Sequence, residues 1–156
     1  MAKVSAGLLA YRTEAGRLEV LLVHPGGPYW AQKDLGAWTI PKGEIEQSEE
    51  PLQAARREFA EETGFESQGR FIELGVVKNK SGKTIHAFAF EGNFQTHRVV
   101  SITCQIEWPP RSGRLQPFPE IDRAEYFSVD VAKQKINAAQ AAFIDELVAQ
   151  LERHDK

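Results

Sequence analysis

Three glutamates carry the strongest chemical signal in the sequence, because Glu58, Glu61 and Glu62 lie almost side by side. On a helix, the residues four positions from Glu58 are Ala54 and Glu62, so its helical neighbours offer no cation. Like charges at this spacing destabilise an exposed helix, and more so where water is partly excluded. A charge run is ordinarily a solvated face, but a bound divalent cation explains this cluster better, because carboxylate oxygens suit magnesium or manganese.

The element that must position these carboxylates is a single helix. Pro51 suits the first turn of a helix and Gly64 suits its C-terminal stop, so the sequence predicts a helix from about Pro51 to Thr63. At about 100° per residue, one arc of this helix is expected to face the core: Leu52, Ala55, Phe59 and Thr63. Two of the three glutamates fall immediately beside that arc, so the acidic cluster borders the buried face.

The rest of the pattern predicts a sheet with helices packed on it, an α/β or α+β sandwich. Strands are expected at Val4–Arg12, Leu18–His24, Phe71–Lys78, Thr84–Gly92, Val99–Trp108 and Ala124–Ser128. The turn-rich segment 25–36 and the Pro/Gly-rich segment 109–120 are predicted to be loops. Asp130 is expected to cap a short helix, and a final helix from about Ala138 to Arg153 packs on the core by one apolar stripe.

Composition and length limit the class of protein. The chain has 156 residues, and we expect a single domain over residues 1–156. Its net charge of -3 gives no support for general nucleic-acid binding or an anionic-membrane partner. Cys104 is the only cysteine, so an internal disulfide is impossible and a cytoplasmic location fits best. No window approaches the roughly 20 apolar residues of a membrane span, and the pattern does not predict an oligomeric state.

Residues 43–65 resemble a known family signature, the Nudix box. Its pattern is Gly, five residues, Glu, seven residues, Arg-Glu, an apolar residue, any residue, Glu-Glu, any residue, Gly and an apolar residue. The chain matches it without a departure: Gly43, Glu49, Arg57, Glu58, Phe59, Glu61, Glu62, Gly64 and Phe65. The surrounding strand order also looks like the Nudix α/β/α sandwich, with a mixed β-sheet and the box forming a loop-helix-loop. The resemblance implies a hydrolase that cleaves a diphosphate linkage in nucleoside diphosphate-linked substrates, using Mg²⁺ or Mn²⁺.

The resemblance also implies roles for residues within the box. It implies a metal-ligand set made of the Gly43 carbonyl oxygen and the carboxylates of Glu58, Glu61 and Glu62, with Glu61 acting directly or through water. Arg57 and Glu49 would form the supporting pair that orients the ligand helix. The alternative for that pair is a surface salt bridge, which would contribute little to stability. The box residues expected in catalysis are therefore Glu58, Glu61, Arg57 and Glu49.

A further catalytic carboxylate is expected outside the box, where it would accept a proton from the attacking water. The segment PFPEID places Glu120 between Pro119 and Ile121, and its two prolines reduce the entropy lost when the side chain is fixed. Rigid placement suits a general base. Asp122 and Glu107 are competitors for this role, and a solvated loop glutamate is the alternative.

Substrate contacts are suggested by two further resemblances. The segment WTIPKGE, residues 38–44, resembles the corresponding segment of Nudix enzymes that act on dinucleoside polyphosphates or diphosphoinositol polyphosphates. Lys42 is expected to meet a phosphate oxygen there, with a solvated loop lysine as the alternative. Residues 107–127 resemble a bacterial group of nucleoside-triphosphate pyrophosphohydrolases, without identifying the substrate. Other candidate substrate contacts are Arg111, Arg114 and Tyr29, with Trp30, Tyr126 and Phe127 as further aromatic candidates, while Trp38 is expected in the core.

These patterns leave three functions open. The first is a metal-dependent diphosphohydrolase of small nucleotides, with dinucleoside polyphosphates first and nucleoside triphosphates next. The second is hydrolysis of a diphosphoinositol polyphosphate or of pyrophosphate at an RNA 5′ end. The third is a catalytically silent Nudix module that senses a nucleotide, which a broken box would favour, since fold alone does not fix function.

Overall fold

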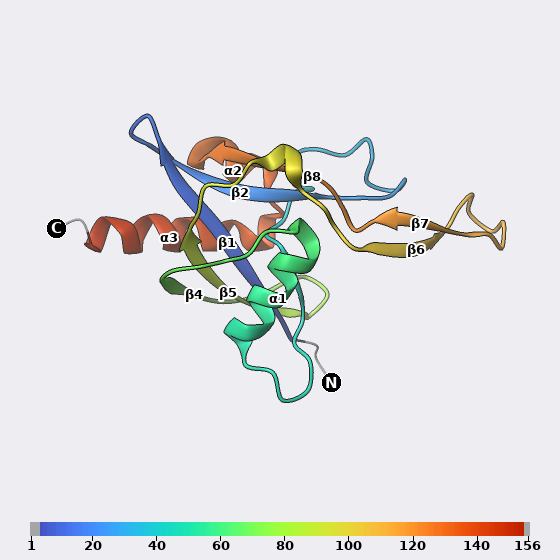
Figure 1. The fold of residues 1–156 in the computed structure, drawn as a ribbon, viewed down its shortest axis with the longest axis horizontal. Coiled ribbons are helices and arrows are strands. Elements are labelled where there is room, and N and C mark those ends of the chain that lie inside the picture. The colour runs from blue at the N-terminus through green and yellow to red at the C-terminus, as the bar shows by residue number, and fades with distance from the viewer. Residues whose placement is uncertain (1–3, 155–156) are drawn as a thin grey trace.

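The computed structural model describes residues 4–154, and residues 1–3 and 155–156, the ends of the expected domain, lie outside the described part. A six-stranded sheet forms the middle layer (Figure 1). Helix α1 (Pro51–Thr63) covers one face, and helices α2 (Val129–Lys135) and α3 (Ala141–His154) cover the other. This α/β/α arrangement confirms the fold class that the sequence predicts.

The sheet is mixed, as the family resemblance implies. Its strands are β1 (Val4–Glu14), β2 (Arg17–Pro25), β3 (Lys42–Glu44), β4 (Phe71–Lys78), β5 (Thr84–Glu91) and β8 (Ile121–Ser128). The order is β4-β5-β1-β2-β8, with β3 also paired to β1. Strands β1 and β5 run parallel, whereas the other pairs are antiparallel. Residues 6–10 of β1 are all buried, because both faces of this central strand are covered by helices.

Two apolar cores, one on each face of the sheet, fix the helices. On the α1 side, the ring of Phe59 meets Phe90 of β5 edge-on, with centroids 5.3 Å apart. On the other side, Phe143 and Ile144 of α3 pack against the sheet. Trp38 lies in this second core and is 1% exposed, which confirms its predicted role in packing.

Helix α1 has the bounds that the sequence predicts. Pro51 occupies its first turn, and Gly64 ends it with a φ of 80°. This left-handed conformation favours glycine, and the Gly64 N–H donates to the Ala60 carbonyl (2.8 Å). Leu52, expected on the core face, is half-buried and packs against the edge of the α1-side core.

A two-stranded arm projects from one end of the sheet (Figure 1). It consists of β6 (Thr103–Glu107) paired antiparallel with β7 (Leu115–Pro119). The strand predicted at Val99–Trp108 is therefore shorter than expected, and part of the segment 109–120, predicted to be a loop, is a strand. The prolines of β7 are tolerated because each strand of a two-stranded ribbon has an open edge.

The C-terminal elements differ slightly from expectation. Ser128, and not Asp130, occupies the N-cap position of α2, and Asp130 lies in the first turn, where its charge suits the helix dipole. The helix predicted from Ala138 begins as a short 3₁₀ helix, η2 (Ala138–Gln140), that leads into α3. Another 3₁₀ turn, η1 (Thr96–Arg98), precedes the arm. In residues 4–154, no helix is both long and apolar enough to cross a membrane.

Candidate active site

The pairing of β3 with β1 brings the start of the box against helix α1. Gly43 lies opposite Ala6 in this ladder. A Cβ atom built on Gly43 would lie 2.0 to 2.3 Å from the carboxylate atoms of Glu58, so a side chain there would displace this carboxylate. The absence of a side chain at Gly43 therefore allows the carboxylate of Glu58 to lie directly against the backbone of β3.

Glu62 is the most deeply buried carboxylate of the cluster, with 5% of its surface exposed. The backbone N–H of Lys42 donates to its Oε2 (2.9 Å). Burial raises the pKa of Glu62 to about 8, and the positive charge of Lys42 opposes this shift only in part. Among the described residues, no side chain forms an ion pair with Glu62. The fold therefore buries a carboxyl group and provides no cationic side chain to stabilise its ionised form.

Glu58 is also largely buried, with its side chain 13% exposed. Burial raises its pKa, whereas the hydrogen bond from Arg57 lowers it. That bond joins Arg57 Nη1 to Glu58 Oε1 (2.8 Å), so the expectation that Glu58 finds no cation among its helical neighbours is wrong. Adjacent residues do not face each other on a helix, but the arginine side chain is long enough for the guanidinium of Arg57 to reach the carboxylate of Glu58.

Arg57 connects the helix to the preceding loop. Its Nε and Nη2 donate to the two carboxylate oxygens of Glu49 (2.8 and 3.0 Å), and Nη2 also donates to the Glu44 carbonyl (3.0 Å). Hydrogen bonding to Arg57 lowers the pKa of Glu49 to about 2. Arg57 Nη1 also reaches Glu61 Oε2 at 3.3 Å, a pair at i, i+4 spacing on the helix. A bidentate guanidinium of this kind fixes both partners in orientation.

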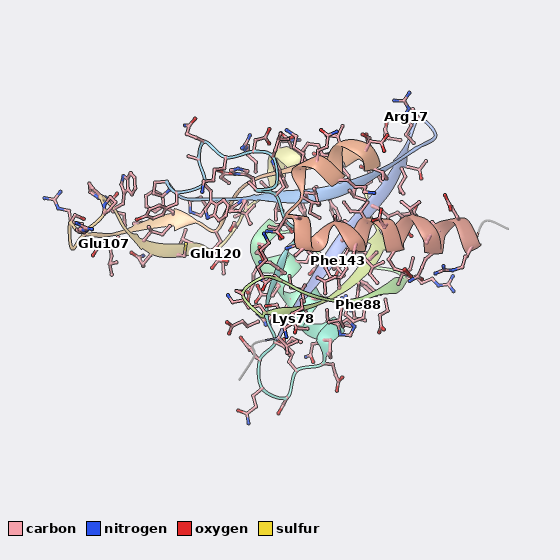
Figure 2. The ribbon with its side chains drawn as sticks, turned by 180° about the vertical axis from the view of Figure 1, so that it is seen from behind. Arg17, Lys78, Phe88, Glu107, Glu120 and Phe143 are labelled. Carbon is pink, nitrogen blue, oxygen red and sulfur yellow. The ribbon has the colours of Figure 1, made fainter. Side chains whose placement is uncertain are left out.

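Glu120 lies at the base of the arm, beside the box helix (Figure 2). Its N–H donates to the Ile102 carbonyl (2.9 Å), and the Ile102 N–H donates to the carbonyl of Glu61 (3.0 Å). Gly26 N–H in turn donates to the Glu120 carbonyl (2.8 Å). Burial raises the pKa of Glu120, the charge of Glu61 raises it further, and Lys42 lowers it. The charge of Glu120 likewise raises the pKa of Glu58 and Glu62. The carboxylates of Glu58, Glu61, Glu62 and Glu120 are therefore close enough to interact electrostatically.

The two competitors of Glu120 lie in different surroundings. Asp122 Oδ1 lies within hydrogen-bond distance of Nδ1 of the fully buried His24 (2.9 Å). Glu107 lies on the outer part of the arm, well away from Glu120 (Figure 2), and accepts a hydrogen bond from the Arg111 N–H (2.9 Å). The structure therefore brings Glu120, and neither competitor, next to the box carboxylates. Its role as a base stays a prediction.

The predicted substrate contacts divide into two groups. Lys42 lies near the carboxylates, because its charge acts on both Glu62 and Glu120. The other group lies on the arm and the loop beside it: Arg111, Arg114 and Tyr29. Of the further aromatic candidates, Tyr126 donates its hydroxyl proton to the Gly92 carbonyl (2.7 Å), and Phe127 packs against Trp38.

Sequence reasoning missed the contacts that fix the surroundings of Glu120. The Ser101 hydroxyl donates to the Ile102 carbonyl (2.7 Å) and accepts from the Ile121 N–H (3.1 Å). The His24–Asp122 pair on the neighbouring strands was also missed. Ser101 and Ile121, like His24 and Asp122, are far apart in the sequence, and no local pattern marks them.

The donor set fits a hard divalent cation in its chemistry. Oxygen ligands are available from Glu58, Glu61 and Glu62, and Glu61, with its side chain 38% exposed, stands at the open side of the cluster. In the described part of the chain, no three His, Cys, Asp or Glu side chains are placed so that together they could hold a metal ion. The buried, uncompensated Glu62 is nevertheless the kind of group that a cation would neutralise, so we regard the residues as compatible with Mg²⁺ or Mn²⁺.

Comparison with known proteins identifies the family. A NUDIX domain model matches residues 1–147, and the chain belongs to this family. It is 60% identical over 109 residues to an RNA pyrophosphohydrolase of Bartonella bacilliformis, an alignment that covers 60% of this chain and 59% of that protein. The chain spans at most 64% of the length of the curated relatives it matches.

Solved structures share the fold at low sequence identity. An Ap4A hydrolase of Caenorhabditis elegans in a binary complex aligns with a TM-score of 0.66 at 21% identity, covering 95% of this chain and 98% of that one. The NUDIX domain of Shewanella oneidensis NrtR, in complex with ADP ribose, aligns with a TM-score of 0.66 at 18% identity, covering 97% and 89%. At these identities the solved structures show the shared fold, and the family model and the intact box show membership of the Nudix family.

Proposed function

We propose that the protein is a divalent-metal-dependent hydrolase of diphosphate linkages in nucleotides, with dinucleoside polyphosphates as the first substrate class and nucleoside triphosphates as the next. The observation that supports this most is the burial of Glu62 beside Glu58, with no cationic side chain of the described residues paired to Glu62. A buried charge of this kind destabilises a fold unless a partner neutralises it. A metal ion that binds both Glu62 and the substrate phosphates would explain why the fold tolerates this buried carboxyl group.

The box residues would act together on the cation. Glu58 and Glu62 would hold it, with Glu61 and the carbonyl oxygen of Gly43 completing the protein ligands. When bound, the cation neutralises charge on the diphosphate and makes the attacking water more acidic. Arg57 keeps its neighbouring carboxylates in orientation through the guanidinium contacts described above. Positioning and charge stabilisation of this kind are the main catalytic terms in phosphoryl transfer.

Two residues outside the helix would complete the chemistry. Lys42 would meet a phosphate oxygen, because its charge already lies near Glu62 and Glu120. Glu120 would accept the proton of the attacking water. Its pKa is raised by burial, and a carboxylate shifted toward neutral pH is a stronger general base.

Two observations bear on the choice of substrate. The segment WTIPKGE and the shared fold of an Ap4A hydrolase support dinucleoside polyphosphates. The similarity to a Bartonella RNA pyrophosphohydrolase supports an RNA 5′ end as the second candidate. We also infer a cytoplasmic location, which the lone Cys104 supports, and a single domain over residues 1–156.

The proposal is tested by incubating the purified protein with a nucleotide panel in Mg²⁺ and identifying the products by chromatography. The panel contains diadenosine polyphosphates, nucleoside triphosphates, ADP-ribose, NADH and a 5′-triphosphorylated RNA. We expect cleavage of diadenosine tetraphosphate to mononucleotides and loss of activity in EDTA. A far higher kcat/KM for ADP-ribose or NADH would contradict the substrate choice, and full activity in EDTA would contradict the metal dependence.

A further inference from the structure

The outer half of the arm and the loop beside it form a surface that the chemistry above does not use. We call it the arm patch, and its residues are Tyr29, Trp30, Lys33, Trp108, Arg111 and Arg114. The rings of Tyr29 and Trp108 meet edge-on, with centroids 5.5 Å apart. Tyr29 is 53% exposed and Trp30 is 40% exposed, and Lys33 Nζ lies over the Trp30 ring, 5.0 Å from its centroid. Among the described residues, neither arginine of the patch forms a side-chain ion pair.

The arm patch is held in place by close backbone packing. A Cβ atom on Gly26 would lie 2.0 Å from the Pro119 carbonyl oxygen, so the loop crosses the arm where only glycine fits. Further along the loop, Nε2 of the buried His24 donates to the Lys33 carbonyl (2.6 Å). Both ends of the segment that carries Tyr29 are therefore anchored. A surface fixed in advance loses less entropy when it binds a ligand.

The arm patch shares one face of the arm with Glu120. The Trp108 N–H donates to the Arg114 carbonyl (3.0 Å), which extends the β6–β7 ladder outward, and the Glu120–Ile102 bond extends it inward. Side chains alternate between the two faces of a strand, so Arg114, Phe118 and Glu120 lie on the same face. Burial follows this alternation, because Phe118 is half-buried while both flanking prolines are exposed. Six residue steps at about 3.4 Å place Arg114 roughly 20 Å from Glu120.

We propose that the arm patch is a second nucleotide subsite, which binds the base and phosphate of a nucleotide linked to the phosphorus attacked beside α1. Exposed aromatic rings with free cations are the combination that binds single-stranded nucleotides, since every base has a face that can stack. The separation from Glu120 is longer than one nucleotide, so the subsite serves only extended substrates. Their second nucleotide comes either from a dinucleoside polyphosphate or from an RNA 5′ end. This inference rests on the proposed diphosphate hydrolysis at α1.

The test compares short and extended substrates in two variants, Tyr29→Ala and Arg114→Ala. ATP, diadenosine tetraphosphate and a short 5′-triphosphorylated RNA are the substrates, and kcat and KM are measured for each in Mg²⁺. Loss of one stacking or phosphate contact should raise KM for at least one extended substrate by about tenfold relative to the change for ATP, with kcat little affected. Arg17→Ala is the matched control, because Arg17 is an exposed arginine at the opposite end of the molecule (Figure 2).

The outcomes separate the sources of the second nucleotide. A rise in KM for diadenosine tetraphosphate alone assigns the subsite to a dinucleoside polyphosphate, and a rise for the RNA alone assigns it to RNA. Equal changes for ATP and both extended substrates, or no change in either folded variant, would overturn the proposal. If no substrate is cleaved, the proposed function fails, and tryptophan fluorescence titration with uncleaved diadenosine tetraphosphate and RNA then decides the subsite. Binding that is weakened in both variants but not in Arg17→Ala supports it, and equal binding overturns it.

Discussion

Glu62→Gln should stabilise the protein in the absence of metal. The substitution keeps the size of the side chain and an oxygen that accepts the Lys42 N–H, but removes a buried ionisable group. Burial raises the pKa of Glu62 from 4.5 to about 8. A carboxyl group with a raised pKa in the fold contributes its full stability below its unfolded pKa, and this contribution is lost as pH rises from about 4.5 to about 8.

The size of the effect follows from this pKa. At pH 7 the buried carboxyl costs about 3 kcal/mol of folding free energy, from 1.36 kcal/mol for each of roughly 2.5 pH units above the unfolded pKa. A chain of this size shifts its melting temperature by about 2–4 °C for each kcal/mol. Glu62→Gln should therefore raise the metal-free melting temperature at pH 7 by about 6–12 °C.

The assay is thermal unfolding in EDTA between about pH 4.5 and pH 8.5, a range that spans the titration of Glu62. The two proteins should melt together at the acid end and diverge as pH rises. Glu66→Gln, the same substitution at an exposed position just after the end of α1, is the matched control and should follow the wild type. Saturating Mg²⁺ should stabilise the wild type more than Glu62→Gln. A pH-independent difference, or a less stable variant at pH 8, would refute the reasoning.

Three further predictions concern turnover. Glu58→Gln should keep the fold, measured by circular dichroism, and reduce kcat by orders of magnitude, because it removes a metal ligand. Glu120→Gln should slow turnover by roughly 10²–10⁴-fold with a nearly unchanged melting temperature. Normal kinetics in Glu120→Gln together with impaired kinetics in Glu107→Gln would assign the general base to Glu107 instead. Arg57→Lys should lower both kcat and thermal stability, because a lysine cannot hold Glu49 in a bidentate pair, and an unaltered variant in both assays would exclude a positioning role.

Local sequence signals predicted most of the fold. Helix α1 has the predicted bounds because a proline start and a glycine stop act within a few residues of the helix itself. Strand β7 was missed because its prolines mark a loop in the local pattern, whereas its pairing with β6 depends on a partner across a turn. Asp130 was predicted to cap α2, but the helix begins two residues earlier and Ser128 occupies the cap position. The sequence does not fix helix ends to within one or two residues.

The sequence could predict only those parts of the site that depend on the spacing of residues within one local segment. The i, i+4 rule accounts for the contact between Arg57 and Glu61, but no helical spacing rule predicts the bond from Arg57 to the adjacent Glu58. The proline-rich segment pointed to Glu120, yet its place beside the box comes from backbone bonds through Ile102 and Gly26. Those contacts join segments distant in the sequence, so no motif could have revealed them.

The central claim is that the carboxylates of α1 form a divalent cation site, and binding of Mn²⁺ followed by electron paramagnetic resonance tests it without assuming any substrate. The wild type should deplete the signal of free Mn²⁺ to saturation, and Mg²⁺ should restore the signal by competition. Glu58→Gln should bind weakly, whereas Glu107→Gln, on the outer arm, should bind like the wild type (Figure 2). Equal Mn²⁺ binding by the wild type and Glu58→Gln would contradict the account.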